Sequence, residues 1–235
     1  YRVALAQLYY ENAFFEAAQD IYESLRDDAI AQGDVAGTAE LLRSLAVISF
    51  RLGNLQDAVC YSWDAVQYKP ASDQVAHHAR LLLGLDYISA ADEFLSAYLK
   101  DPNAQKEDYV LHLYSLVRFA SGQYDDAFTW SKRALLYSHG NQDLDFEIRL
   151  VQAILFDMST VARQDLLPKE DAEDKEEKEK KYLDRRQQIL TDKRLEGDWV
   201  LYWPSSFVTE VRNKARDADA QNVDSSWNFL EGIIF

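Results

Sequence analysis

The stretch RLGNLQDAVCYSWDAVQYKP, residues 51–70, carries the strongest clue to the fold of this chain. It has the composition of an amphipathic helix, with Gly53, Ala58, Ala65 and Pro70 at fixed intervals. Glycine permits a tight turn, small alanine side chains let two helices approach closely, and proline ends a helix because it has no backbone N–H. The stretch therefore predicts a turn followed by the second helix of a helical hairpin.

The same spacing recurs along the chain. SGQYDDAFTWSKRALLY, which begins at Ser121, repeats the interval from glycine to first and second alanine. AADEFLSAYLKDP, residues 90–102, and LAQLYYENAFFEAAQDIYESL, residues 5–25, repeat parts of it. The anchor alanines of the four copies are separated by 40, 32 and 37 residues, and they are Ala18, Ala58, Ala90 and Ala127. The sequence thus predicts four degenerate repeats of one helical unit.

These residues resemble the tetratricopeptide repeat family, whose 34-residue period lies close to the mean interval. The second copy matches the family's pattern at Leu42, Leu45, Ala46, Gly53, Ala58, Ala65 and Pro70. Ser49 and Arg118 depart from it where an aromatic residue is usual, and the third copy's first helix, about residues 73–84, aligns in two registers. The resemblance covers roughly residues 1–140. It implies an all-α, TPR-like helical-hairpin solenoid with a helical C-terminal extension.

Three segments are expected along the chain. Residues 1–164 form the repeat array, closed by a helix that places Phe146, Leu150, Ile154 and Met158 at helical spacing. Residues 165–197 form a charged helix or linker. Within it, residues 169–181 are either an exposed helix with opposite charges four residues apart or a disordered acidic linker.

Residues 198–235 form an aromatic-rich C-terminal segment. It holds Trp199, Trp203 and Trp227, three of the five tryptophans, and ends in the apolar run Ile233 to Phe235. Soluble monomers rarely leave so much apolar area exposed. We therefore expect this segment to dock on the repeat array of its own chain or, in trans, on another molecule. That molecule is either a partner protein or a second copy of this chain.

Composition narrows the classes of function. The chain has 235 residues, of which 48% are hydrophobic and 13% aromatic, enough for a core. Its formal charge of −15 disfavours nucleic-acid partners, because proteins bind nucleic-acid phosphates mainly through Lys and Arg side chains. The single cysteine fits a reducing cytoplasmic location, and no apolar run reaches the length of a membrane span. The sequence begins at Tyr1 without Met, which leaves open that it is a piece of a longer protein.

The spacings that signal catalysis or metal binding are not found in the sequence. The eight glycines do not cluster into a phosphate loop, and the acidic stretch near residue 217 has Asn222 and Asn228 where a calcium loop needs Gly and Glu. Adjacent His77 and His78 point about 100° apart on a helix, so we expect one to face solvent and the other a neighbouring helix. Cys60 is expected to pack in the core. We predict no enzyme activity, no cofactor and no metal site.

The family resemblance implies a concave surface lined by the first helix of each repeat. Its groove positions carry over to Val3 and Gln7 and to seven predicted partner-binding residues: Tyr10, Arg43, Val47, Phe50, His112, Leu116 and Phe119. This set is mostly apolar and suits an apolar peptide or amphipathic helix, although Phe50 and Phe119 could equally be core residues. The expected function is a non-catalytic scaffold or adaptor in a larger complex. The alternative is a regulatory or targeting module of an enzyme whose catalytic domain lies outside this sequence.

Overall fold

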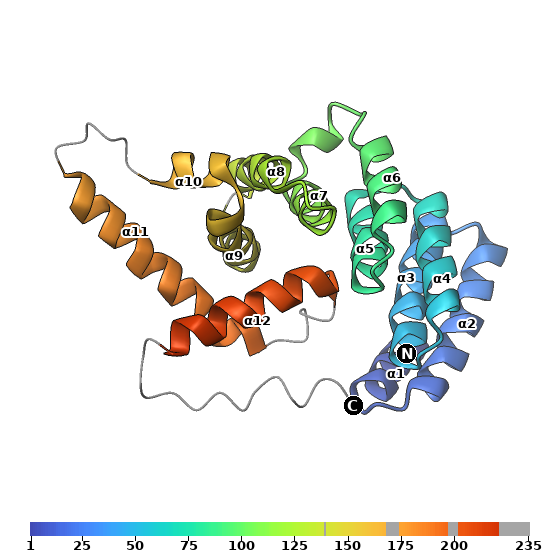
Figure 1. The fold of residues 1–235 in the computed structure, drawn as a ribbon. Helices are drawn as coiled ribbons and strands as arrows, with labels where there is room; N and C mark the ends of the chain where they lie inside the picture. The colour runs from blue at the N-terminus through green and yellow to red at the C-terminus, as the bar shows by residue number, and fades with distance from the viewer. Residues whose placement is uncertain (139, 168–173, 197–201, 221–235) are drawn as a thin grey trace. The chain divides into compact units, whose positions relative to one another are not determined.

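The computed structural model shows an all-α protein (Figure 1). The structure describes residues 1–138, 140–167, 174–196 and 202–220, and every regular element within these ranges is a helix. The predicted all-α class is therefore confirmed for this part of the chain. Contacts divide the chain into two compact units, Tyr1–Leu82 and Leu83–Phe235, with the boundary in the last turn of one helix. Each unit is described by itself.

Unit 1 is built from helices that pack against their neighbours in sequence, α1 on α2, α2 on α3 and α3 on α4. The helices are α1 (Arg2–Glu11), α2 (Phe15–Gln32), α3 (Val35–Arg51), α4 (Leu55–Tyr68) and α5 (Ser72–Gly84), which carries the boundary. The first turns of α5 are tied to the unit by two hydrogen-bonded pairs. The Gln74 amide donates to the Glu40 carboxylate at 2.7 Å, and Ser62 Oγ lies 2.7 Å from His78 Nδ1.

Small residues form the centre of unit 1, as close helix packing requires. Ala6, Ala18 and Ala58 are completely buried, and Leu45 and Ile48 of α3 pack beside the first two of them. A larger side chain at any of these alanines would force the helices apart. The predicted role of Ala18 and Ala58 as contact points between helices agrees with their burial.

Several turns between consecutive helices share one backbone geometry. Before α4, Gly53 is left-handed with φ of 80°, its N–H donates to the carbonyl of Phe50, and the Asn54 N–H donates to the carbonyl of Ser49. These two bonds make a Schellman motif, which ends a helix and reverses the chain. The turn before α2 makes the same two bonds around Ala13, which has φ of 60°. The Ala13 N–H donates to the carbonyl of Tyr10, and the Phe14 N–H donates to the carbonyl of Tyr9. The turn is thus a repeated feature even where glycine is missing.

A fixed interval links each of these turns to the helix that follows. Six helices begin two residues after a left-handed residue, and four of them have a completely buried alanine five residues after that residue. The pairs are Ala13 with Ala18, Gly53 with Ala58, Asp86 with Ala91 and Gly122 with Ala127. The predicted anchor Ala90 is therefore wrong by one position: it is exposed and Ala91 is buried. No glycine marks this shift in the sequence, because Asp86 takes the left-handed turn.

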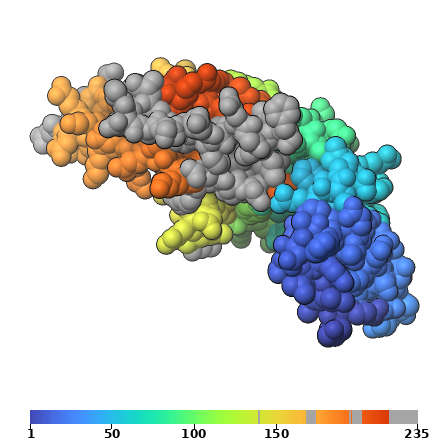
Figure 2. All heavy atoms as spheres, turned by 90° about the horizontal axis from the view of Figure 1, so that it is seen from below, coloured from blue at the N-terminus to red at the C-terminus, as the bar shows by residue number. Residues whose placement is uncertain are grey.

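Unit 2 continues with helices that also pack on their neighbours, α6 on α7, α7 on α8 and α8 on α9. The elements after α5 are α6 (Ile88–Tyr98), η1 (Ala104–Lys106), α7 (Asp108–Ala120), α8 (Tyr124–Tyr137), α9 (Gln142–Met158), α10 (Thr160–Leu166), α11 (Lys175–Leu190), η2 (Lys193–Glu196) and α12 (Ser205–Ala220). Helix α11 packs on α9, and α12 packs on α7, α9 and α11. The space-filling view shows parts of α11 in orange and α12 in red (Figure 2).

Helix α9 packs against α8. Phe146, Leu150 and Ile154 are buried, as expected for a helix that covers the last repeat, and Met158 is partly buried. The charged region contains α11, whose start carries the predicted Asp174–Lys178 pair at 2.7 Å. Residues 168–173 and 197 of that region lie outside the described residues. So do residues 221–228, most of the acidic stretch that was compared with a calcium loop. Across the part that is described, no helix is long and apolar enough to cross a membrane.

Candidate functional site

Unit 1 contains a pocket of about 220 Å³ formed by side chains from α1, α2, α3 and α5. The lining residues are Gln7, Tyr10, Tyr22, Arg43, Ser44, Val47, Ile48 and His77. The four from α3 occupy one face of that helix, because residues three and four positions apart lie side by side. Helices α1, α3 and α5 are alternate helices of the chain, so the pocket is lined mainly by the first helix of each predicted repeat.

The apolar wall of the pocket is aromatic on one side and aliphatic on the other. Tyr10 packs against Phe15 with ring centroids 5.6 Å apart. Tyr22 is buried, donates its hydroxyl to Gln7 Oε1 at 3.3 Å, and has a pKa raised by that burial. Val47 is half-buried, and Ile48 beneath it is part of the core of the unit. This wall is suited to an apolar side chain.

The polar wall contains two buried nitrogen atoms without hydrogen-bond partners. Arg43 binds the Glu40 carboxylate through Nη2 at 2.5 Å, while its Nε is buried and unpaired. His77 Nε2 is also buried and unpaired. Burial, with smaller contributions from Arg43, Arg80 and His78, lowers the pKa of His77 to about 4. His77 is therefore neutral at pH 7.

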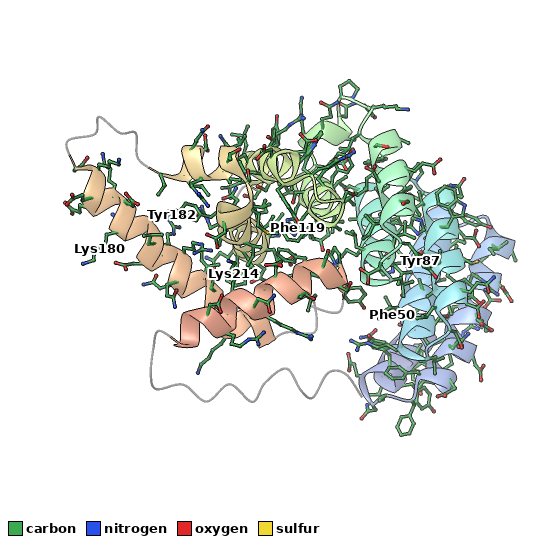
Figure 3. The ribbon with its side chains drawn as sticks, viewed as in Figure 1. Phe50, Tyr87, Phe119, Lys180, Tyr182 and Lys214 are labelled. Carbon is green, nitrogen blue, oxygen red and sulfur yellow. The ribbon has the colours of Figure 1, made fainter. Side chains whose placement is uncertain are left out.

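Three of the seven predicted partner-binding residues meet in this pocket: Tyr10, Arg43 and Val47. Gln7 from the same carried-over positions lines it as well, whereas Val3 is exposed elsewhere on α1. Phe50, labelled in Figure 3, is half-buried near the end of α3 and is not among the lining residues. The pocket of unit 1 is thus lined by three of the seven predicted residues.

The other three predicted residues lie inside unit 2. His112, Leu116 and Phe119 of α7 are each at most 2% exposed. Phe119 points toward α12 (Figure 3) and meets the Phe207 ring edge-on, with centroids 5.1 Å apart. His112 Nε2 lies 3.1 Å from the Glu147 carboxylate of α9. In unit 2 this face of the repeat is covered by helices of the same chain.

Two expectations about single residues are wrong. Cys60 is exposed and does not pack in the core, because α4 buries Ala58, Ser62 and Ala65 on a different face. Neither histidine of the 77–78 pair points freely into solvent: His78 is buried beside Ser62, and the Nε2 atom of His77 lies buried at the pocket. Adjacent residues can both be covered when a helix has neighbours on two sides.

The sequence did not identify Tyr22, Ser44, Ile48 and His77 as part of the site. Tyr22 lies on α2, the second helix of the first predicted repeat, whereas the positions carried over from the family are on first helices. Ser44 and Ile48 are adjacent to the carried-over positions Arg43 and Val47 of α3. His77 belongs to the helix whose register could be aligned in two ways. Once Ala91 is taken as the anchor of the third repeat, the position of the preceding helix is defined.

The pocket has the chemistry of a binding site. Its polar groups are one guanidinium, one neutral imidazole, an amide and hydroxyls, which can orient a ligand through hydrogen bonds. Among the residues that the structure describes, no three His, Cys, Asp or Glu side chains gather to hold a metal ion. No protein-family model matches the chain, and a search of curated proteins also found no match.

Proposed function

We propose that this chain is a TPR-like interaction module, a non-catalytic scaffold that binds a peptide segment of a partner protein. The observation that carries the proposal is the pocket in unit 1, where Tyr10, Arg43 and Val47 come together from α1 and α3. Support for the TPR-like assignment comes from the five-residue interval between a left-handed turn and a buried alanine, which recurs at four turns. A repeated hairpin with an open first-helix face is the arrangement by which helical repeats bind peptides.

The pocket defines what its peptide should offer. An apolar side chain of the peptide would pack between Tyr10 and Val47 and remove apolar area from water, worth about 25 cal/mol for each Å² buried. A carbonyl or side-chain oxygen would accept a hydrogen bond from the Arg43 guanidinium, whose side chain is 42% exposed. The His77 imidazole, which stays neutral at pH 7, lines the same pocket. The expected ligand therefore combines one apolar anchor with neighbouring polar atoms.

Selection from a random peptide library tests the proposal, because it requires no candidate partner. The full chain is immobilised, bound peptides are recovered, and their affinities are measured by fluorescence polarisation. Val47→Asp places a charge in the apolar wall, and we expect it to weaken the selected peptides about tenfold or more, because a buried unpaired charge is costly. Circular dichroism checks that the variant keeps its helical content.

Val35→Asp is the matched control. Val35 is exposed in the first turn of the same helix α3, where an acidic side chain is tolerated by the helix dipole. Peptides that bind the wild type and Val35→Asp but not Val47→Asp support the proposal. Failure to select any peptide that discriminates between the two variants would overturn it.

A further inference from the structure

A second pocket, of about 230 Å³, lies within unit 2 between α9 and α11. Its lining residues are Arg149, Gln152 and Ala153 of α9, Leu166 at the end of α10, and Tyr182, Arg185, Arg186 and Ile189 of α11. On both long helices these positions are spaced three or four residues apart, so each helix presents one face to the pocket. None of the described residues that line it is acidic, although the chain has 40 Asp and Glu against 25 Lys and Arg.

One of the three arginines is fixed by the protein itself. Arg186 donates from Nε to the Ala153 carbonyl at 2.8 Å and from Nη2 to the Asp157 carboxylate at 2.7 Å. Lys214 of α12 binds the same carboxylate at 2.7 Å. Burial opposes ionisation of Asp157, but the hydrogen bond from Lys214 and the charge of Arg186 outweigh it and lower its pKa. Asp157 therefore stays ionised and holds Arg186 at the pocket wall.

The other two arginines have no such partner. Neither Arg149 nor Arg185 makes a hydrogen bond or ion pair with any residue that the structure describes. Arg185 is exposed and Arg149 is partly buried. Both line one small pocket, so an anion bound there is attracted by both charges. The planar guanidinium group is also the side chain best matched to paired oxygen atoms of phosphate or carboxylate.

One of the remaining polar groups of the pocket, the Tyr182 hydroxyl, is also a hydrogen-bond donor. Burial raises the pKa of Tyr182, labelled in Figure 3, to about 12, so its hydroxyl keeps its proton near pH 7. The Gln152 amide is buried, and its Nε2 donates to Ser131 Oγ at 3.4 Å. Guanidinium groups donate and cannot accept hydrogen bonds. Ala153, Leu166 and Ile189 add an apolar side to a pocket that is otherwise rich in donors.

We propose that this pocket binds a phosphomonoester group. A phosphomonoester carries a charge of about −1.5 to −2 at pH 7 and three acceptor oxygens. These complement the Tyr182 hydroxyl and the two arginines that pair with no described residue, Arg149 and Arg185. A carboxylate has a single charge and satisfies fewer of these donors. The apolar side of the pocket receives the carbon group that bears the phosphate. The site lies entirely within unit 2 and is independent of the peptide pocket in unit 1.

Isothermal titration calorimetry on the full chain tests the site with three probes: phenyl phosphate, benzoate and a phosphotyrosine peptide. Phenyl phosphate is expected to bind more tightly than benzoate, which has the same ring. The double variant Arg149→Gln/Arg185→Gln is expected to lose affinity for phenyl phosphate by about tenfold or more, since hydrogen bonds to charged groups are lost. Circular dichroism confirms that the variant is folded.

Lys181→Gln/Arg216→Gln is the control, since it removes the same charge from two exposed residues outside the pocket. It should bind phenyl phosphate like the wild type. Equal affinity for phenyl phosphate and the phosphopeptide indicates a small-molecule ligand, and much tighter peptide binding indicates a phosphorylated protein; both support the site. No binding of either phosphorylated probe, tighter binding of benzoate, or an equal loss in both double variants would overturn it.

Discussion

Helices α3 and α7 carry corresponding positions of the predicted repeat, yet the two faces have different surroundings within their own units. On α3, Arg43 and Val47 remain partly exposed and line an open pocket. On α7, Leu116 and Phe119 are buried, and Phe119 contacts Phe207 of α12. A repeat position by itself therefore does not make a binding surface, because a later part of the chain can cover it.

The covered face also indicates what the repeat surface accepts. Helix α12 presents Phe207, Val211 and Ala215 at intervals of four residues, all buried, and Trp203 stacks edge-on against Phe207. An amphipathic helix with one aromatic anchor thus fits the α7 face. The backbone N–H of Ser205, at the start of α12, donates to Asp86 at 2.8 Å and helps to fix the position of that helix in unit 2.

The largest expected effect on stability comes from removing the aromatic side chain of Phe207. Phe207→Ala should lower the free energy of unfolding by about 3–5 kcal/mol, because Phe207 is completely buried and the cavity left behind is lined by Phe119 and Trp203. Urea denaturation measures it, with the partly buried neighbour Val208→Ala as a control of smaller cost. An unchanged unfolding midpoint would mean that α12 leaves the α7 face open in solution, and the comparison with α3 would fail.

Lowering the pH should reduce the stability of unit 1, which holds the open pocket, through His77 and His78. Burial lowers the pKa of both to about 4 in the folded state, from an ordinary value of 6.5. The unfolded chain therefore binds more protons between these values, so stability is full above pH 6.5 and falls as the pH drops toward 4. The slope is about 1.4 kcal/mol per pH unit for each histidine below pH 6.5, which amounts to about 2.5 kcal/mol for the pair between pH 7 and 5.5.

Thermal denaturation across this pH range measures the effect. The double variant His77→Gln/His78→Gln should make stability less dependent on pH. Phe207→Ala, which acts in unit 2, should leave the slope unchanged. A wild-type stability independent of pH from 7 to 5 would contradict the burial of both rings.

The buried alanines test what the two units have in common. Ala58→Leu in unit 1 and Ala91→Leu in unit 2 should each cost about 1–3 kcal/mol, because overpacking separates the helices. Ala90→Leu is the adjacent control on an exposed position and should change stability by less than about 0.5 kcal/mol. If Ala90→Leu proved the more damaging variant, the five-residue interval after Asp86 would be wrong.

The smallest effects are expected at the left-handed turns. Gly53→Ala and Gly122→Ala should each destabilise by about 1 kcal/mol, since φ is positive and nothing lies within 4 Å of an added Cβ. Ala13→Gly should raise stability by up to about 1 kcal/mol, because it relieves the same strain. Chemical denaturation of the three variants measures these differences. A loss of stability in Ala13→Gly would show that this turn differs from its counterparts.

Much of the fold could be predicted because its signals are local. The helical spacing, the left-handed glycines and the buried Ala18, Ala58 and Ala127 each depend on a few neighbouring residues. The prediction failed where a signal was missing: Asp86 replaces the turn glycine, so the third repeat was placed one residue early. For the site, Arg43 and Val47 were found because their helix was in register, and His77 was missed because its helix was not.

The sequence by itself determined the helices, the turns marked by glycine and most of the alanines at helix contacts, since hydrogen bonding within a helix and the need for small side chains are set by short-range spacing. Only the tertiary structure decided that Phe207 covers Phe119, that His77 meets Arg43, and that Arg149 shares a pocket with Arg185. Each of these contacts joins separate helices. Many partners satisfy the same amphipathic pattern, and the choice among them depends on shape and charge complementarity that exists only after the helices pack.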